Sequence, residues 1–435
     1  MRSDANFIYK YAIEASLPDP VVRAGLEKFR LPSGRLILVA IGKAAYTMAK
    51  CAKDILGDRV DAGIIITKYG HSGKDIDGIK ICEAGHPIPD ENGVRATEAA
   101  LEMTSSLTKD DAVLFLVSGG GSALFESPMC SLGELSALTE SLLSSGADIE
   151  EINTVRKHVS KVKGGRFAEH VYPARIFSII LSDVIGDRID AIASGPAVPD
   201  LSTSEEARAV LNKYKIKASK EILEALSYET PKSISGAEHF VGGSVTQLCL
   251  AAKEAAEKRG YKTEIISTEE RGVARALGKR IAEIAAQKCY TDAPLAIIIG
   301  GETVVKVKGD GLGGRNQEIA LTASFFIAGM NNIAIFSVAS DGTDGPTEAA
   351  GGFVDGESFI KMEAVGAKPV SSLENNDSYT ALKSIDGLII TGPTGTNVND
   401  LSVALIRPID LSKKRERRFS NLERVMNFGL CPKEK

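Results

Sequence analysis

The amino-acid sequence predicts a two-domain α/β protein, and three observations point to this fold class. Its 435 residues leave room for two or three domains of about 150 residues each. Short apolar runs alternate along the chain with segments of helical periodicity. The apolar runs are hydrophobic at nearly every position, as expected where helices cover both faces of a parallel sheet. We therefore expect a larger, Rossmann-like, doubly wound domain and a smaller α/β domain after it.

The larger domain is expected over residues 1–235. Its strands are predicted at 35–42, 62–69, 79–84, 111–122 and 175–184. Its helices are predicted at 4–16, 44–56, 90–107, 131–146, 150–171 and 204–228. The first strands are each followed by a helix or by another apolar run, which is the order of the βαβ units that build parallel sheets.

The smaller domain is expected over residues 236–406, because a polar, turn-rich stretch precedes it. Its strands are predicted at 238–244, 263–268, 293–307, 333–341 and 387–392. Its helices are predicted at 245–259, 273–289, 315–328 and 378–384. Residues 407–435 form a basic tail with a helical pattern, which we expect to be a solvated or packing helix.

Composition and charge exclude several classes of protein. Lys and Arg number 52 against 57 Asp and Glu, a net charge of −5, so the chain lacks the strongly basic field of a nucleic-acid binder. No apolar run is long enough to span a bilayer, and the first residues do not resemble a signal peptide. The six cysteines form no CxxC pair and the five histidines no HExxH motif. We expect free thiols, no zinc site and a cytoplasmic location.

Glycines gather where the predicted strands end. The segments that show this are 41–44, 118–122, 242–244, 300–302 and 391–395. Ligands of open parallel sheets bind at the carboxyl ends of the strands, where glycine lets backbone N–H groups approach an anion. Phosphate is the natural ligand, although a glycine can also simply terminate a strand. A Walker A loop is absent, so a P-loop fold is disfavoured.

One glycine segment, at 309–314, matches the GxGxxG pattern of dinucleotide sites and lies between a predicted strand and a predicted helix. Asp341 ends the next strand, somewhat beyond the usual distance of the ribose-binding carboxylate. The helix, however, opens with Arg315 and Asn316, and a guanidinium beside N–H donors suits a phosphoryl group better. The segment is therefore weak support for NAD.

Phosphoryl transfer needs cations, a divalent metal and a group that orients the acceptor hydroxyl. Lys43 directly follows the first strand. Carboxylates that follow strands are candidates for a metal or base position, or else cap a turn: Asp183, Asp187, Asp341 and Asp344. A cationic segment could contact substrate or equally be a wet helix face: Arg156, Lys157, Lys161 and Lys163.

Eight strings occur in order along the chain: IGKAA, GHPIPDENG, LVSGGGSAL, NTVRKHVSKVKGG, SDVIGDRIDAIASGP, GGETVVKVKGDGLGGRNQE, SDGTDGPTEAAGG and TGPTGTNVNDL. Together they resemble the class II glycerate 2-kinases, the family with a carboxy-terminal MOFRL domain. The resemblance runs from the first strand to about Ile406. It implies phosphorylation of D-glycerate at the 2-hydroxyl by ATP with Mg²⁺ or another divalent cation, in a cleft between two α/β domains.

The resemblance also suggests site residues. The family's proposed active-site lysine and arginine fall on Lys43 and Arg315. We expect Asp183 to be the catalytic carboxylate, and Asp183 and Asp341 to be metal ligands. The expected substrate- or nucleotide-binding residues are Ser118, Gly119, Gly120, Gly121, Ser122, Arg156, Glu302, Asn316, Asp341, Thr396, Asn397 and Asp400. The tail beyond about Arg407 departs from the family's usual ending, and we expect a monomer or homodimer.

Two alternatives stay open. An NAD-dependent oxidoreductase of hydroxy acids would use the 309–314 segment and Asp341. A non-catalytic protein that closes on an anionic metabolite would use the same glycines and cations. Formation of ADP from ATP and glycerate distinguishes the kinase from both.

Overall fold

A computed structural model describes residues 1–182, 184–186 and 188–409. The chain divides into two compact units. The N-terminal unit is Ser16–Ser244 with Gly395–Val398, and the C-terminal unit is Met1–Ala15, Val245–Thr394 and the chain from Asn399 onward. These limits differ from the predicted ones, since residues 1–15 belong to the C-terminal unit and residues 236–244 to the N-terminal unit. The predicted tail lies, from residue 410, outside the described residues.

The N-terminal unit is built on a six-stranded sheet in the order β3-β2-β1-β4-β5-β6. Its strands are β1 (Leu36–Ile41), β2 (Ala62–Lys68), β3 (Ile79–Ala84), β4 (Ala112–Val117), β5 (Arg175–Leu181) and β6 (Ala237–Gly243). Every neighbouring pair is parallel. The central strands β1 and β4 are buried at every position, because helices cover both faces. The predicted doubly wound domain is thus confirmed.

The helices of this unit differ from the predicted ones at several places, and the helices predicted at 150–171 and at 204–228 are each divided into two. They are α2 (Pro18–Leu26), α3 (Ala45–Leu56), α4 (Glu91–Thr104), α5 (Gly121–Leu124), α6 (Leu132–Ser144), α7 (Ile149–His158), α8 (Arg166–Val171), α9 (Ser204–Lys213) and α10 (Lys220–Ala225), with 3₁₀ turns at Gly57–Arg59 and Ile192–Ser194. Helix α2 was not predicted. The single helix predicted at 150–171 is wrong, because α7 ends at His158 and α8 begins only after Gly164 and Gly165, which have left-handed φ angles of 57° and 86°.

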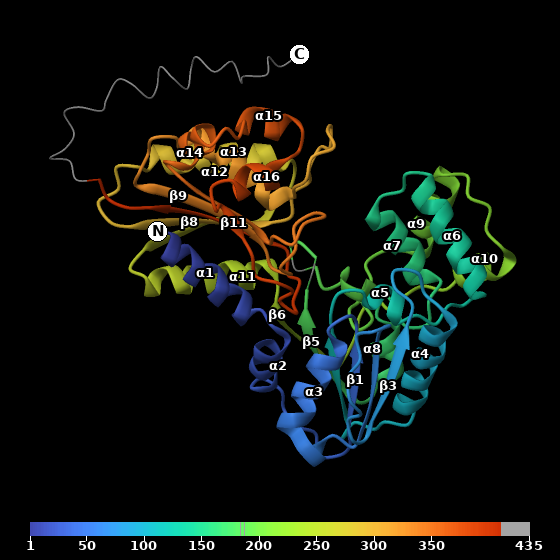
Figure 1. The fold of residues 1–435 in the computed structure, drawn as a ribbon. Coiled ribbons are helices and arrows are strands. Elements are labelled where there is room, and N and C mark those ends of the chain that lie inside the picture. Colours follow the sequence, from blue (N-terminus) through green and yellow to red (C-terminus); the bar gives the residue numbers. More distant parts are fainter. Residues whose placement is uncertain (183, 187, 410–435) are drawn as a thin grey trace. The chain divides into compact units, whose positions relative to one another are not determined.

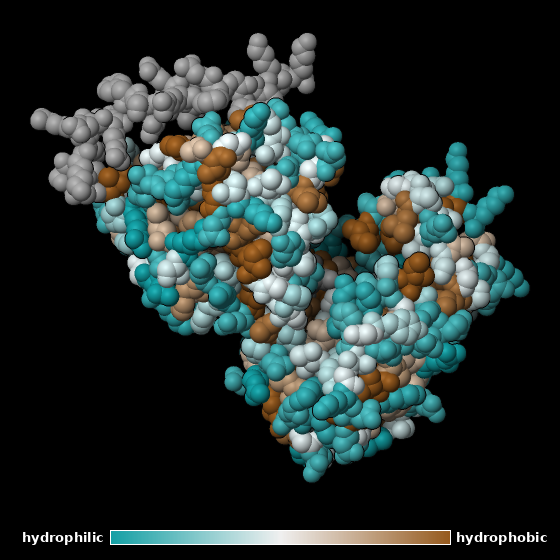
Figure 2. Space-filling model, viewed as in Figure 1, coloured by the Kyte–Doolittle hydropathy of each residue, from teal (hydrophilic) through white to brown (hydrophobic). Residues whose placement is uncertain are grey.

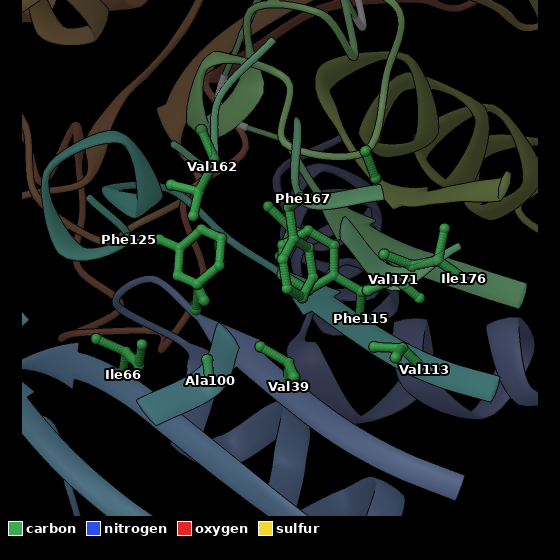
Figure 3. Close-up of a cluster of buried hydrophobic side chains, with 14 of the residues drawn as sticks. Val39, Ile66, Ala100, Val113, Phe115, Phe125, Val162, Phe167, Val171 and Ile176 are labelled. Atoms are coloured by element: carbon green, nitrogen blue, oxygen red, sulfur yellow. The ribbon is translucent and has the colours of Figure 1, made fainter. Parts of the chain in front are cut away.

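Among the described residues, two hydrophobic clusters contribute to the core of the N-terminal unit. One lies along the parallel sheet, where Phe115 of β4, Phe125 after α5 and Phe167 of α8 pack with ring centroids 5.1 to 5.9 Å apart (Figure 3). The other joins α6, α7, α9 and α10, which gather in a helical lobe (Figure 1). Phe125 therefore fixes the segment after β4 to the core of the sheet.

The C-terminal unit has a mixed sheet in the order β11-β10-β9-β12-β8-β7. Its strands are β7 (Lys262–Glu270), β8 (Leu295–Gly301), β9 (Ile333–Ala339), β10 (Gly351–Asp355), β11 (Leu388–Ile389) and β12 (Asp400–Ile406). Only β7 and β8 pair in parallel among these neighbours. Strands β10 and β12 were not predicted, although β12 is buried throughout and lies between β8 and β9.

Helices cover this second sheet as well. They are α1 (Arg2–Ala15), α11 (Val245–Lys258), α12 (Ala274–Gln287), α13 (Arg315–Phe326), α14 (Ser358–Ala364), α15 (Pro369–Glu374) and α16 (Ser378–Lys383). In Figure 1, α1 and α11 lie on one side of the sheet and α12 to α16 on the other. Among the described helices, none combines the length and apolar character needed to cross a membrane. The visible surface is mainly hydrophilic, with scattered hydrophobic residues (Figure 2).

Candidate functional site

The carboxyl edge of the parallel sheet brings Lys43 beside the glycine-rich loop at 118–122. Strands β1 and β4 are neighbours, so the residues that follow them meet. The N–H of Lys43 donates to the carbonyl of Gly119 at 2.9 Å, and the N–H of Ala44 donates to Ser118 Oγ at 3.0 Å. Gly42 has a φ of 108°, and a Cβ there would lie 2.3 Å from Ser118 Oγ, so only glycine fits. The side chain of Lys43 is exposed.

The loop itself is open at Gly120. This residue has a φ of 89°, and a Cβ added to it would lie 3.1 Å from His86 Nε2 and 3.4 Å from Lys43 Cε. The loop continues into α5, whose Ser122 hydroxyl lies 3.1 Å from that of Ser194. Ser118 and Gly121 are buried, whereas Gly119, Gly120 and Ser122 are partly exposed. The part of the loop accessible to a ligand is therefore centred on Gly119 and Gly120.

A buried charge network supports the loop from behind. Lys163 Nζ donates to the carbonyls of Ser122 and Phe125 at 2.8 and 2.9 Å, and lies 3.4 Å from Glu126. Arg156 Nη2 donates to the same Ser122 carbonyl at 2.9 Å. Lys163 and Glu126 have no exposed side-chain surface, and burial lowers the pKa of Lys163 to about 8 despite the nearby carboxylate. Lys163 and Arg156 therefore fix the loop through the Ser122 carbonyl.

The other members of the predicted cationic segment divide between burial and exposure. Lys157 is buried and lies 3.2 Å from Asp200, whose side chain is 1% exposed. Only Lys161 of the four cations is exposed, and it lies in a bend after α7 rather than on a helix face. Arg156, Lys157 and Lys163 are each engaged by carbonyl or carboxylate oxygens.

The segment after β5 carried two predicted carboxylates, Asp183 and Asp187, and both lie outside the described residues. Further along, Ala193, Ser194 and Gly195 have consecutive left-handed φ angles of 52°, 60° and 64°. Two of these residues carry a Cβ, and such strained backbone clusters at functional sites. The string SDVIGDRIDAIASGP includes these residues, but the sequence carries no signal for their conformation.

In the C-terminal unit, Arg315 begins α13 and is held by two carboxylates. Its Nε and Nη2 donate to Asp400 at 2.6 and 3.0 Å, and its Nη1 lies 3.0 Å from Glu302. The Asp400 side chain is 6% exposed, and burial raises its pKa to about 7 even though the guanidinium acts in the opposite direction. The structure thus brings together three predicted residues, with Asp400 positioning the arginine.

Two more predicted residues of this unit are engaged by the protein. Asn316 is fully buried, accepts from Ser337 Oγ at 2.6 Å and donates to Asp344 at 3.3 Å. Asp344 also accepts from the N–H groups of Asn316 and Gln317 at 3.1 and 2.9 Å, so it caps α13. Asp341 accepts from the N–H of Thr343 at 3.0 Å, which is a turn contact.

The glycines at 309–314 are explained by close packing. A Cβ at Gly309 would lie 2.1 Å from Asn375 Oδ1, one at Gly311 would lie 2.5 Å from Asp377 Cβ, and one at Gly314 would lie 2.3 Å from Asp344 Cγ. The GxGxxG match therefore does not need a dinucleotide to account for it.

Thr396 and Asn397 belong to the N-terminal unit, while Asp400 belongs to the C-terminal unit. Thr396 is buried and its hydroxyl donates to the carbonyl of Ser16 at 2.8 Å. Asn397 is exposed. Within the described residues, no group of three His, Cys, Asp or Glu side chains could hold a metal ion.

Comparisons with known proteins cover most of the chain. A domain of unknown function (DUF4147) matches residues 4–227, and the MOFRL family matches residues 295–400. The D-glycerate 2-kinase of Thermotoga maritima is 53% identical over 405 residues, which cover 92% of this chain and 97% of that protein. A crystal structure of glycerate kinase from the same organism superposes with a TM-score of 0.89 at 52% identity, covering 93% and 99% of the two chains.

Of two further relatives, one is named a kinase and the other a putative reductase. A glycerate 2-kinase of Pyrococcus horikoshii is 41% identical over 392 residues, which cover 86% of this chain and 88% of that protein. A putative hydroxypyruvate reductase of Agrobacterium vitis is 39% identical over 388 residues, with the same coverages of 86% and 88%.

Proposed function

The chain belongs to the MOFRL-domain glycerate kinase family, and from this premise we propose that it transfers the γ-phosphoryl group of ATP to the 2-hydroxyl of D-glycerate. The products are 2-phospho-D-glycerate and ADP. The observation that carries the proposal is the 53% identity to a D-glycerate 2-kinase along nearly the full length of both chains. The fold agrees, since the same architecture is found in a glycerate kinase crystal structure.

The chemistry of the two cations supports phosphoryl transfer. The transition state spreads negative charge over the equatorial oxygens of the moving group, and positioned cations stabilise it. The exposed Lys43 ammonium can reach such an oxygen without leaving a carboxylate. A guanidinium has five N–H donors, and Asp400 and Glu302 accept three of those of Arg315, which leaves donors for a phosphoryl oxygen. We propose that each cation contributes positive charge to phosphoryl transfer.

The rest of the predicted machinery is part of the proposal. Gly119 and Gly120 would offer N–H groups to substrate, and Asp183 would orient or deprotonate the acceptor hydroxyl. Mg²⁺ usually keeps several waters and binds through one or two carboxylates plus substrate phosphates, so it does not need a cage of three side chains. Asp341 or Asp183 could supply such a carboxylate, and the ion would neutralise phosphate charge when bound. Cytoplasmic location and a monomeric or homodimeric state complete the proposal.

A coupled assay of ADP formation from ATP, Mg²⁺ and D-glycerate tests the reaction. We expect turnover with D-glycerate, and phosphorus NMR of the product should show the 2-phosphate. The 3-phosphate would correct the position of transfer, and absence of ADP would refute the kinase. Oxidation of NADH with hydroxypyruvate in the absence of ATP would instead favour a reductase, whereas heat of glycerate binding without ADP would favour a metabolite sensor.

A further inference from the structure

We infer that the carboxyl edge of the parallel sheet holds a subsite for a 2-hydroxy carboxylate, built from Lys43, Lys68, His86 and the backbone of Gly119 and Gly120. The Lys68 ammonium, one of the three N–H donors of Lys43 and the backbone N–H groups bind the carboxylate, which leaves Lys43 donors for a phosphoryl oxygen. The imidazole of His86 forms a hydrogen bond with the neighbouring hydroxyl. Lys68 and His86 were not among the predicted site residues. The inference rests on the proposed function, since D-glycerate is the hydroxy acid concerned.

The topology of the sheet places these residues at one edge. Strands β3, β2, β1 and β4 are consecutive neighbours and run in parallel, so their carboxyl ends lie together. Lys68 is the last residue of β2 and pairs with Ala84, the last residue of β3, two residues before His86. Lys43 lies two residues after Ile41, the last residue of β1. Ile41 pairs with Val117, the last residue of β4. Four strand ends thus contribute to one edge.

Gly120 lies against two members of the group, His86 and Lys43. An added Cβ would lie 3.0 Å from His86 Cδ2, 3.1 Å from His86 Nε2 and 3.4 Å from Lys43 Cε. The imidazole and the lysine chain therefore both lie against this residue. Its left-handed conformation presents successive N–H groups, a geometry that binds anions.

The polar atoms of this group are not engaged by other protein groups. Within residues 1–182, 184–186 and 188–409, no hydrogen bond or ion pair involves the ammonium of Lys43, the ammonium of Lys68 or the ring nitrogens of His86. The N–H groups of Gly119 and Gly120 have no acceptor in the same residues. Elsewhere in this unit, Lys157 and Lys163 are both bound to buried carboxylates. Donors that are left unengaged at a sheet edge are suited to an anionic ligand.

The surrounding charges favour an anion and a neutral imidazole. Burial, followed by the positive charges of Lys43, Lys68 and His71, lowers the pKa of His86. Of the nearby carboxylates, Glu83 accepts from Ser72 Oγ at 2.7 Å and Asp90 accepts from Tyr69 at 2.6 Å. Both carboxylates therefore accept hydrogen bonds from protein hydroxyls rather than from Lys43, Lys68 or His86. An uncharged ring keeps one N–H, which can donate to the hydroxyl oxygen and leave the hydroxyl proton to Asp183, while the ammonium groups attract the carboxylate.

Calorimetric titration with two acids tests the subsite. D-Glycerate carries the 2-hydroxyl and 3-hydroxypropionate lacks it. We expect the intact protein to prefer D-glycerate by about tenfold, the effect of one hydrogen bond made in a site built for it. His86→Ala should weaken D-glycerate about tenfold and leave 3-hydroxypropionate unchanged, and His86→Gln should restore part of the preference. Lys68→Met should weaken both acids equally and keep the preference.

Lys80→Met is the matched control, because Lys80 is exposed near the opposite end of β3. It should bind both acids like the parent protein. Loss of both acids alike in His86→Ala, or no loss in Lys68→Met, would overturn the inference. Weakened ADP binding in Lys68→Met with unchanged glycerate binding would assign the edge to the nucleotide and also overturn it. If glycerate binds with the expected pattern while no ADP forms, the subsite stands and the kinase proposal fails.

Discussion

Lys43 and Arg315, one in each unit, are cations in opposite surroundings. No carboxylate of the described residues pairs with the exposed Lys43 ammonium, whereas Asp400 and Glu302 hold the Arg315 guanidinium. A flexible, hydrated ammonium can follow a moving ligand, and a planar guanidinium fixed by a bidentate carboxylate is positioned in advance. A cation can therefore interact with a ligand alone, as we propose for Lys43, or with both a ligand and carboxylates of the fold, as we propose for Arg315. Substitutions should separate the two cases.

The largest effect on stability is expected for Lys163, a cation fully committed to the fold. Lys163→Met would leave Glu126 buried without its ammonium and the Phe125 carbonyl without its donor, while the Ser122 carbonyl would keep only Arg156. The free energy of unfolding should fall by about 3–5 kcal/mol in urea titration. Lys161→Met is the control, since this exposed neighbour should change stability by less than about 0.5 kcal/mol. Equal stability of the two variants would contradict the assigned role.

Arg315→Met should lose both activity and stability. We expect kcat/KM for D-glycerate to fall about 10²- to 10³-fold, as for other positioned charges at a transferring group. The buried Asp400 would also lose its partner, so the free energy of unfolding should fall by about 1–3 kcal/mol. Steady-state kinetics and urea titration on the same preparation measure the two effects. A loss of activity with unchanged stability would place Arg315 in the same class as Lys43.

Lys43→Met should lose activity alone. Its kcat/KM should fall by a similar 10²- to 10³-fold, roughly, for the same reason. Because its ammonium has no carboxylate partner among the described residues, the thermal midpoint should stay within error of the parent protein. A clear drop in that midpoint would show that the ammonium is bound within the fold after all.

Asp400 should cause a gradual pH dependence of stability, spread over several pH units. Its pKa is raised to about 7 in the folded protein, and the ordinary value is 3.8. Between these values the folded state keeps a proton that the unfolded chain has released, so stability falls as pH rises through this window. The slope for one group is at most about 1.4 kcal/mol per pH unit. Asp400→Asn should lack this slope in urea titrations from pH 4 to pH 7, and an unchanged slope would contradict the assignment.

The sequence predicts the parallel sheet well because its strands are continuous apolar runs, such as β1 and β4. It does not reveal β10, which begins with Gly351 and Gly352, residues of low strand propensity. A Cβ at Gly351 would lie 1.9 Å from the carbonyl of Ser337, so this glycine is imposed by a neighbouring strand. The placement of α1 against α11 was equally beyond local pattern, since more than two hundred residues separate them.

Prediction of the candidate site was limited in the same way. Lys43 and Arg315 follow glycine-rich strand ends, which is a local signal. Lys68 and His86 become relevant only because β2 and β3 are neighbours of β1, and strand order cannot be read from a motif. Burial of Lys163 was hidden because its segment has helical periodicity, although α7 ends at His158 and Lys163 lies in the turn before α8.

The short segment Gly395–Val398 has a consequence for how the protein is made. It belongs to the N-terminal unit, although the chain on both sides of it belongs to the other unit. The ribosome therefore completes the N-terminal unit only after it has synthesised nearly four hundred residues. A fragment cut after Ser244 would lack Thr396, whose hydroxyl donates a hydrogen bond to the carbonyl of Ser16. Either half expressed alone should therefore lack part of a folded unit. Activity should return only when both fragments are expressed in the same cell.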